Sequence, residues 1–295
     1  MLSFAQSAEH LFFLEWTPSD TGPKVLQYKK IKYNNSKTLY KNFLDDTLKN
    51  FNKNSLNASN SVTLSIDINN ILITSFNYDS NIKLEEYVEW YKNKILNPYI
   101  LDNFDIYFYP LNNKENSIMV ICINNEIKNN IIKSCEKHQY DLMHLTLDLF
   151  SASSAINIYK KKNVKNYLLW KIDKNNFHYG LYYENNNLKH FIRIKKTNKI
   201  ECIQSIGNQS LKEDLIKLYD QVLFKNKVEA TFIDKIFVYQ TKTSFTLLKK
   251  VSKINKILVM DIGSKFINKK SNKKSLQFNL LGFNENCNSI RGIDV

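Results

Sequence analysis

Short hydrophobic stretches of strand length alternate with longer stretches whose apolar residues recur at helical spacing through most of the chain. The first short stretch, His10–Trp16, is separated from a second one, Lys24–Tyr33, by a turn that contains Pro, Ser, Asp and Gly, which predicts a β-hairpin. Ser36 can cap a helix whose apolar residues continue at helical spacing to Phe51. The beginning of the chain is therefore predicted to form two paired strands followed by a helix.

A second pair of strands is predicted downstream. Apolar residues alternate over Val62–Ile68, Asn69-Asn70 supplies a two-residue turn, and Ile71–Tyr78 returns as the partner strand. A helix with apolar residues from Leu84 to Ile95 follows, and then a strand over Phe104–Tyr109. This part of the chain is expected to be compact.

The rest of the chain alternates predicted strands and helices. The strands are Ser117–Ile123, Leu142–Leu147, Tyr167–Ile172, Phe177–Tyr183, Leu188–Ile194, Lys235–Gln240 and Lys256–Asp261; the helices are Glu126–His138, Leu149–Tyr159 with Asp148 as its cap, Ser210–Phe224 and Phe245–Val251. The basic run Lys160–Lys162 is the expected linker between two halves. Because each half opens with antiparallel strands and continues as strand, helix, strand and helix, the sequence predicts a duplicated α/β architecture.

Composition supports a large core and argues against a nucleic-acid ligand. The chain has 295 residues, 43% of them hydrophobic, so two lobes are expected rather than one. The net charge of +14 comes with 40 Lys, 40 Asn and only two Arg, Arg193 and Arg291. Proteins that read bases or clamp phosphates generally use the bidentate fork of Arg, so the Lys and Asn excess indicates the codon bias of an AT-rich genome. A basic nucleic-acid-binding protein stays as the third hypothesis for function.

The cysteine and hydropathy patterns favour a cytoplasmic protein. The four cysteines, Cys122, Cys135, Cys202 and Cys287, lie far apart without a C-x-x-C pair, and the first residues lack the basic region of a signal peptide. No apolar run reaches the roughly 18 residues of a membrane span. Free thiols in a reducing compartment are expected, and any association with a membrane is expected to go through a partner.

Several stretches of the sequence resemble the PilM-type pilus assembly proteins, which are relatives of the division protein FtsA in the actin-like superfamily. Ser61–Tyr78 followed by Leu84–Trp90 is similar to that family's inserted subdomain, Leu145–Ala152 to the end of its first lobe, and Tyr167–Ile194 to the opening of its second lobe. The resemblance implies an α/β fold of two actin-like lobes, an RNase H-like duplication, with a small inserted α+β subdomain. The implied boundaries are 1–61 plus 119–162 for the first lobe, 62–118 for the insert and 163–295 for a reduced second lobe.

Glycine is missing where this family's nucleotide-binding turns are expected. Members that bind ATP are expected to carry Asp-x-Gly turns at the start of each lobe and a Gly-Gly turn under the adenosine. In this chain the corresponding positions are expected at Glu15, Thr17, Asp173, Asn175 and Gln240, which are degenerate because none of them is glycine. A Cβ at such a position stands between the backbone amides and a phosphate. No ATP, magnesium or other cofactor is expected, and the interpretation leans against an enzyme; Asp261-Ile262-Gly263 is expected to be a strand-ending turn.

Other candidate groups do not form a recognisable catalytic or metal site. The histidines His138, His144, His178 and His190 show no metal-ligand spacing, so no metal is expected. Ser151, Ser153 and Ser154 lack the Gly-x-Ser-x-Gly elbow of a nucleophile and are expected to pack a helix against a sheet. No catalytic residue is assigned.

The resemblance implies a partner-binding role. In the family, a groove beside the small subdomain takes the short cytoplasmic tail of a membrane-anchored partner, and Trp90 and Tyr109 are the aromatic residues expected to project there. The leading hypothesis is a pseudo-ATPase scaffold, peripheral to the inner membrane, in a type IV pilus or secretion assembly; self-association is left open. The alternative is a functional actin-like ATPase or kinase in which the amides of Asn175 or Asn176 replace those of glycine, since Asn tolerates positive φ.

Overall fold

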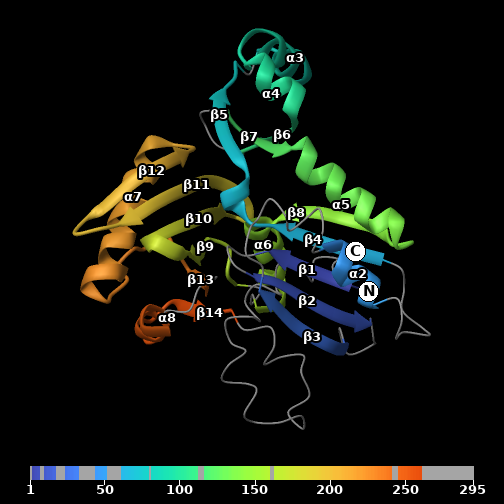
Figure 1. Cartoon of the computed structure of the whole chain (residues 1–295). Helices are drawn as coiled ribbons and strands as arrows, with labels where there is room; N and C mark the ends of the chain where they lie inside the picture. Colours follow the sequence, from blue (N-terminus) through green and yellow to red (C-terminus); the bar gives the residue numbers. More distant parts are fainter. Residues whose placement is uncertain are drawn as a thin grey trace. The chain divides into compact units, whose positions relative to one another are not determined.

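The computed structural model describes residues 2–6, 10–17, 24–32, 44–51, 61–79, 81–111, 116–159, 163–240 and 245–260. The described residues fall into two compact units. Unit 1 takes them from Met1–Ile71 and Ile123–Ile158, and unit 2 takes them from Leu72–Cys122 and Tyr159–Met260. Figure 1 shows the elements of both units coloured along the sequence. Within the described residues, no helix is both long and apolar enough to cross a membrane.

Unit 1 contains a five-stranded sheet in the order β3-β2-β1-β4-β8. Its strands are β1 (Leu2–Gln6), β2 (His10–Thr17), β3 (Lys24–Lys32), β4 (Ser61–Ile66) and β8 (Asp141–Leu147). The strands β1, β2 and β3 form an antiparallel meander, whereas β4 runs parallel to both β1 and β8. The central strand is therefore the first one in the chain.

The two faces of this sheet differ in side-chain size. Large side chains such as Phe4 and Leu64 lie opposite each other on one face. On the other face, Thr63 Oγ1 donates to Ser3 Oγ at 2.9 Å, and the hydroxyls of Ser65 and Ser151 are 2.7 Å apart. Ser151 belongs to α6 (Asp148–Tyr159). Small hydroxyl side chains thus let α6 approach the sheet closely, as the sequence predicted for Ser151.

The helices α2 (Leu44–Phe51) and α5 (Asn125–Lys137) of unit 1 are joined by a carboxylate. Asp45 Oδ2 lies 2.7 Å from Lys137 Nζ, and Asp45 Oδ1 lies 2.7 Å from His138 Nε2. The hydrogen bond from Lys137, supported by His138, keeps the pKa of Asp45 below its usual value. Asn124 caps α5 by accepting hydrogen bonds from the amides of Glu126 and Ile127.

Unit 2 contains a six-stranded sheet in the order β12-β11-β10-β9-β13-β14. Its strands are β9 (Tyr167–Ile172), β10 (Phe177–Glu184), β11 (Asn187–Lys196), β12 (Ile200–Ile206), β13 (Lys235–Gln240) and β14 (Ile257–Val259). Without β12, the order and the mixture of antiparallel and parallel pairs repeat those of unit 1. β9 therefore corresponds to β1, and the β9–β10 hairpin corresponds to the β1–β2 hairpin.

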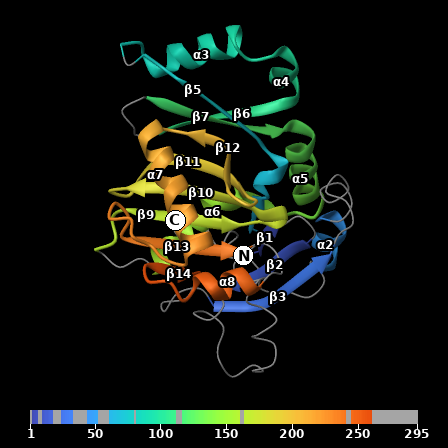
Figure 2. The same ribbon diagram turned by 90° about the vertical axis from the view of Figure 1, so that its left-hand side faces the viewer.

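One face of the unit 2 sheet forms its main core with α7 (Gln209–Asp220) and α8 (Phe245–Val251). The chain continues from α7 into a π-turn, Gln221–Lys225, which ends at Asn226 in the left-handed conformation. Gly180 in β10 is required by this packing, since a Cβ there would lie 2.6 Å from Tyr219 Oη of α7. Figure 2 shows α7 and α8 beside the strands of this sheet.

Unit 2 also contains a three-stranded sheet in the order β5-β7-β6, covered on one face by two helices. The elements are β5 (Leu72–Asn77), β7 (Ser117–Asn124), β6 (Phe104–Pro110), α3 (Leu84–Lys94) and α4 (Pro98–Asn103). Tyr91 of α3 stacks on Phe76 of β5 with ring centroids 4.0 Å apart, and the alternate residues of β6 from Phe104 to Phe108 pack with them. This sheet has its own small core.

Most predicted elements are confirmed within a few residues, and one expectation about strand pairing is wrong. β4 and β5 do not form the expected hairpin, because β4 pairs with β1 and β8, while β5 pairs with β7 in another sheet. A 3₁₀ turn, Ile68–Asn70, takes the chain from one sheet to the other. The strands β1 and β12 and the helix α4 were not predicted. The proposed helix start at Ser36, the linker Lys160–Lys162 and the turn at Asp261–Gly263 lie outside the described residues.

Candidate functional site

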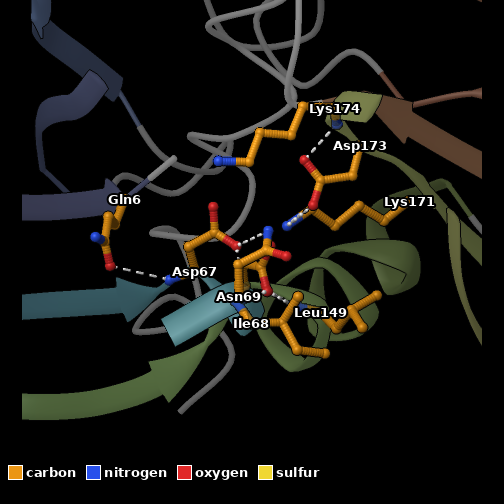
Figure 3. A network of polar contacts seen from close by, with 9 residues as sticks. Gln6, Asp67, Ile68, Asn69, Leu149, Lys171, Asp173 and Lys174 are labelled. Atoms are coloured by element: carbon orange, nitrogen blue, oxygen red, sulfur yellow. Dashed lines mark hydrogen bonds and ion pairs between the residues drawn. The ribbon is translucent and has the colours of Figure 1, made fainter. Parts of the chain in front are cut away.

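Buried polar side chains gather at the carboxyl ends of the central parallel strands of unit 1. Gln6 ends β1, Asp67 follows β4, and both are 1% exposed. Gln6 Oε1 accepts a hydrogen bond from the backbone amide of Asp67 at 3.2 Å. Asp67 Oδ1 accepts from the backbone amide and the side-chain amide of Asn69, at 2.9 and 2.8 Å (Figure 3). The amide of Gln6 and the carboxylate of Asp67 therefore hold the turn after β4.

Asp148 attaches the same turn to α6. Its Oδ1 accepts from the backbone amide of Ile68 at 3.2 Å and from that of Leu149 at 2.8 Å, and its side chain is fully buried. The carboxylate lies at the amino end of α6, where the helix dipole favours a negative charge. Asp148 is the first residue of α6 rather than a residue before it, and its carboxylate also fixes the end of β4.

In unit 2 the corresponding hairpin carries a buried ion pair. Lys171 Nζ lies 3.7 Å from Asp173 Oδ2, and the two side chains are 0% and 1% exposed. Asp173 Oδ1 also accepts from the backbone amide of Lys174 at 2.7 Å, as Figure 3 shows. The ammonium of Lys171 lies 5.5 Å from the centre of the Tyr179 ring on the neighbouring strand. The charge of Asp173 is thus balanced by a cation of the protein itself.

This arrangement bears directly on whether the hairpin can hold a metal. A magnesium ion needs anionic oxygen ligands, and Asp173 is the carboxylate that the hairpin offers. An ammonium 3.7 Å away repels a second cation, and moving it would leave a buried lysine without its counter-charge. Within the part of the chain that the structure describes, no group of three His, Cys, Asp or Glu residues is arranged to hold a metal. The geometry fits a magnesium ion poorly.

The turn of the β9–β10 hairpin is built by asparagine in place of glycine. Asn175 and Asn176 have φ values of 56° and 60°, in the left-handed region that glycine adopts most readily. Among the described residues, six of the eight non-glycine residues with positive φ are asparagine. Asparagine therefore supplies tight turns throughout this chain, and the scarcity of glycine is weaker evidence against a phosphate-binding turn than the sequence suggested.

Glu15 and Thr17 do not lie at the strand end that corresponds to the β9–β10 hairpin. Glu15 and Thr17 lie within and at the end of β2, and Glu15 is paired with Leu2 and Gln27. The duplication of the sheets makes β1–β2 the counterpart of β9–β10, so the corresponding strand end is Gln6. The alternating apolar residues Leu2 and Phe4 were the signal that could have found β1. Gln240 ends β13 as expected, and the side chains of Thr17 and Gln240 lie outside the described part.

The two aromatic residues expected at a partner site lie on opposite sides of the three-stranded sheet. Trp90, on α3, is 48% exposed and contacts Tyr87 edge-on with ring centroids 5.3 Å apart. Tyr109 follows Phe108, which packs under the helices, so its side chain points to the face without helices. Tyr107 and Tyr109 are 45% and 40% exposed. The structure therefore does not bring Trp90 and Tyr109 together.

Two histidines for which the sequence predicts no metal-binding role are buried in unit 2 and neutral. His178 Nδ1 accepts a hydrogen bond from Trp170 Nε1 at 3.2 Å, and His190 Nε2 lies 2.8 Å from Ser205 Oγ. Burial, reinforced by Lys196, lowers the pKa of His178 to about 4, and burial together with Lys212 lowers the pKa of His190 to about 4. Among the described residues, neither histidine belongs to a group of three potential metal ligands.

Comparison with known proteins identifies the fold but not a family. No protein-family model matches the sequence, and no curated protein matches it. A chain of the PilM-PilN type IV pilus biogenesis complex matches the structure with a TM-score of 0.61 and 10% identity, over 99% of this chain and 98% of that one. The cytoplasmic domain of EpsL, from the type II secretion system of Vibrio cholerae, matches with a TM-score of 0.42 and 10% identity, over 88% and 84%. The first likeness shows a mixed α/β fold of the actin-like type; the second is too distant to add to it.

The Lys171–Asp173 pair should be essential for stability. Lys171→Met leaves the Asp173 carboxylate buried without its counter-charge, and we expect a loss of about 3–5 kcal/mol in the free energy of unfolding. Lys171→Met with Asp173→Asn removes both charges and should recover most of that loss. Urea unfolding measures both variants. Lys217→Met is the control, because Lys217 lies 3.8 Å from Asp214 with both side chains at least half exposed; an equal loss in that control would contradict the assignment.

The buried histidines should make the protein sensitive to mild acid. Their pKa values of about 4 in the folded protein lie below the usual 6.5, so the unfolded chain binds protons first as the pH falls. Their stabilising contribution should be complete above about pH 6.5 and decline steadily towards about pH 4. Urea unfolding across that range measures the slope. His178→Phe should flatten the slope, and a pH-independent stability would contradict the burial of both rings.

Proposed function

We propose that this protein is a non-catalytic, actin-like scaffold. It is cytoplasmic and peripheral to the inner membrane, and it holds the cytoplasmic tail of a bitopic membrane partner in a type IV pilus-like or secretion assembly. The fold shared with a chain of the PilM-PilN complex supports the kind of assembly. In this interpretation the five-stranded and six-stranded sheets are the cores of two lobes, and the three-stranded sheet with α3 and α4 is the inserted subdomain.

The observation that carries the non-catalytic half is the buried Lys171–Asp173 pair. The family resemblance places an Asp-x-Gly turn at this hairpin in members that bind ATP, and Asp173-Lys174-Asn175 keeps only its aspartate. That carboxylate is occupied by the Lys171 ammonium at 3.7 Å and by the Lys174 amide. At the counterpart strand end of unit 1, Gln6 is uncharged and its oxygen accepts from Asp67. Phosphoryl transfer depends mostly on metal and phosphate positioning. Among the described residues, Gln6 Oε1 and the Asp173 carboxylate at these two strand ends are already bound by groups of the protein.

A functional ATPase or kinase is the second candidate, and one observation favours it. Asn175 and Asn176 adopt the left-handed backbone that presents amides at a tight turn, as the alternative required. A lysine beside such a turn is also a group that can pair with a phosphate. The two candidate functions differ in whether the Lys171 ammonium pairs with Asp173 or with a nucleotide phosphate. A measurement of ATP binding therefore distinguishes them.

For the partner tail, the face of β6 that lacks helices is the stronger candidate. β6 lies at one edge of the three-stranded sheet, and its alternate residues Tyr107 and Tyr109 are both partly exposed. An extended tail that adds to an edge strand gains backbone hydrogen bonds, and aromatic side chains on alternate positions give it specificity. Trp90 lies on the helical side and would serve a separate surface.

We expect no binding of ATP with magnesium in isothermal titration calorimetry. The decisive variant is Asn175→Gly, which restores the glycine of the Asp-x-Gly turn but keeps the Lys171–Asp173 pair. We expect this variant also to give no binding heat, because the ion pair and not the Cβ blocks the site. Micromolar affinity in the natural protein would overturn the non-catalytic half of the proposal, and binding gained by Asn175→Gly alone would show that the missing glycine was the obstacle.

Photo-crosslinking in the source cells tests the partner half. A photoreactive phenylalanine analogue at position 109 should crosslink to a membrane protein with one transmembrane helix, whereas the same analogue at position 227 should not. Lys227 is a suitable control because it is exposed and paired with Glu229 at 2.6 Å. The same analogue at position 90 tests whether the surface formed by α3 contacts the partner. Absence of any single-helix membrane protein from both position 109 and position 90 would contradict tail binding by this subdomain.

A further inference from the structure

A pocket on unit 2 is lined by lysines. It has a volume of about 420 Å³, and its walls are Asn226, Lys249, Lys250, Lys253 and Ile254. Pockets that bind small molecules span roughly 300–1,000 Å³, so this one is large enough for a small ligand. None of its residues belongs to the β9–β10 hairpin or to β6, the elements used in the proposed function.

The local structure fixes the lysines around the pocket. Leu248, Val251 and Ile254 are buried in the main core of unit 2 and hold α8 and the turn after it against the sheet. The turn is closed by backbone hydrogen bonds from Lys253 to Lys250 and from Ile254 to Val251. All three lysines line the pocket, Lys249 and Lys250 from the last turn of α8 and Lys253 from the turn that follows it.

The pocket wall opposite α8 comes from the end of the π-turn. Asn226 has φ of 55°, and its backbone amide donates to the carbonyl of Gln221. The left-handed residue ends the helical chain and places an amide side chain at the pocket. Asn226 can donate hydrogen bonds to a ligand oxygen, and Ile254 gives the pocket an apolar part.

The lysines of the pocket differ from the neighbouring lysines in how their charges are paired. Lys225 lies 2.9 Å from Asp220, Lys227 lies 2.6 Å from Glu229, and Lys256 Nζ donates to the carbonyls of Ala230 and Ile233. Among the described residues, no carboxylate pairs with Lys249, Lys250 or Lys253, and none lines the pocket. The helix dipole favours Lys249 and Lys250 near the end of α8, but Lys253 lies beyond the helix. Three like charges around one pocket repel each other unless an anion lies between them.

We propose that this pocket binds a phosphate group, with Lys249, Lys250 and Lys253 as its cationic ligands and Asn226 as an additional donor. Lysine ammonium groups bind phosphate as point charges and tolerate several ligand shapes. The phosphate comes either from a small soluble ligand or from the headgroup of an anionic lipid, and the pocket chemistry is the same for both. The site is independent of the proposed scaffold role.

Titration with inorganic pyrophosphate and sedimentation with vesicles distinguish the two sources. We expect saturable pyrophosphate binding by calorimetry, or co-sedimentation with phosphatidylcholine vesicles that contain phosphatidylglycerol but not with phosphatidylcholine alone. The triple variant Lys249→Gln, Lys250→Gln, Lys253→Gln should weaken the binding by about tenfold or more, because it removes three charge-assisted contacts. Pocket-dependent pyrophosphate binding without vesicle binding indicates a soluble ligand, and pocket-dependent vesicle binding indicates a lipid headgroup.

A matched triple variant controls for net charge. Lys217→Gln, Lys225→Gln and Lys227→Gln remove the same number of charges from lysines that are already paired. This control should bind within about twofold of the natural protein, since its lysines do not line the pocket. Both triples should keep the thermal unfolding midpoint of the natural protein. Equal loss of binding in the two triples, or no binding to either pyrophosphate or the anionic vesicles, would overturn the proposal.

Discussion

The ionic contact between Lys171 and Asp173 is the constraint on which the proposed function depends. A fully buried ammonium on a central strand is tolerable only with a counter-charge close by, so Asp173 must stay ionised and stay in place at the end of β9. Its second oxygen is held by the Lys174 amide, which fixes the turn that follows. A carboxylate engaged in this way stabilises the hairpin and is poorly placed to serve a metal ion. The ion pair thus connects the stability of the second sheet to the interpretation of the protein as a scaffold.

Because the order of the strands is repeated in the two units, the end of β9 can be compared with the end of β1. At the end of β1 the chain has Gln6, and the nearby carboxylates of Asp67 and Asp148 accept hydrogen bonds from backbone amides of the turn after β4 and of α6. Buried carboxylates that accept backbone hydrogen bonds compensate for lost hydration in the same way as an ion pair does. At both strand ends, carboxylate oxygens are therefore engaged by groups of their own unit: Asp67 Oδ1 and Asp148 Oδ1 by backbone amides, and Asp173 by Lys171 and Lys174. Such internal use is what a structural role requires.

The turns formed by asparagine change what the low glycine content implies about phosphate-binding turns. Only six residues of the chain are glycine, yet the tight turns at Asn175-Asn176 and Asn185-Asn186 have positive φ without it. Asparagine tolerates this conformation because its short polar side chain forms local hydrogen bonds. Glycine remains where no side chain fits, as at Gly180 against Tyr219. The case against nucleotide binding consequently rests on Lys171, which the composition did not reveal, and less on the absence of glycine.

The sequence alone determined the elements with strong periodicity and clear end signals. The meander from Tyr167 and the amphipathic helix α5 with its Asn124 cap depend on local spacing and local hydrogen bonds, so the meander and the helix could be predicted. It could not show that Leu2–Gln6 is the central strand, or that β4 leaves its neighbour β5 for another sheet, because strand pairing is a contact between distant residues. The pairing of Lys171 with Asp173, the separation of Trp90 from Tyr109 and the grouping of Lys249, Lys250 and Lys253 with Asn226 were likewise decided by the tertiary structure. Burial and side-chain direction set those relations, and both depend on which surfaces pack together.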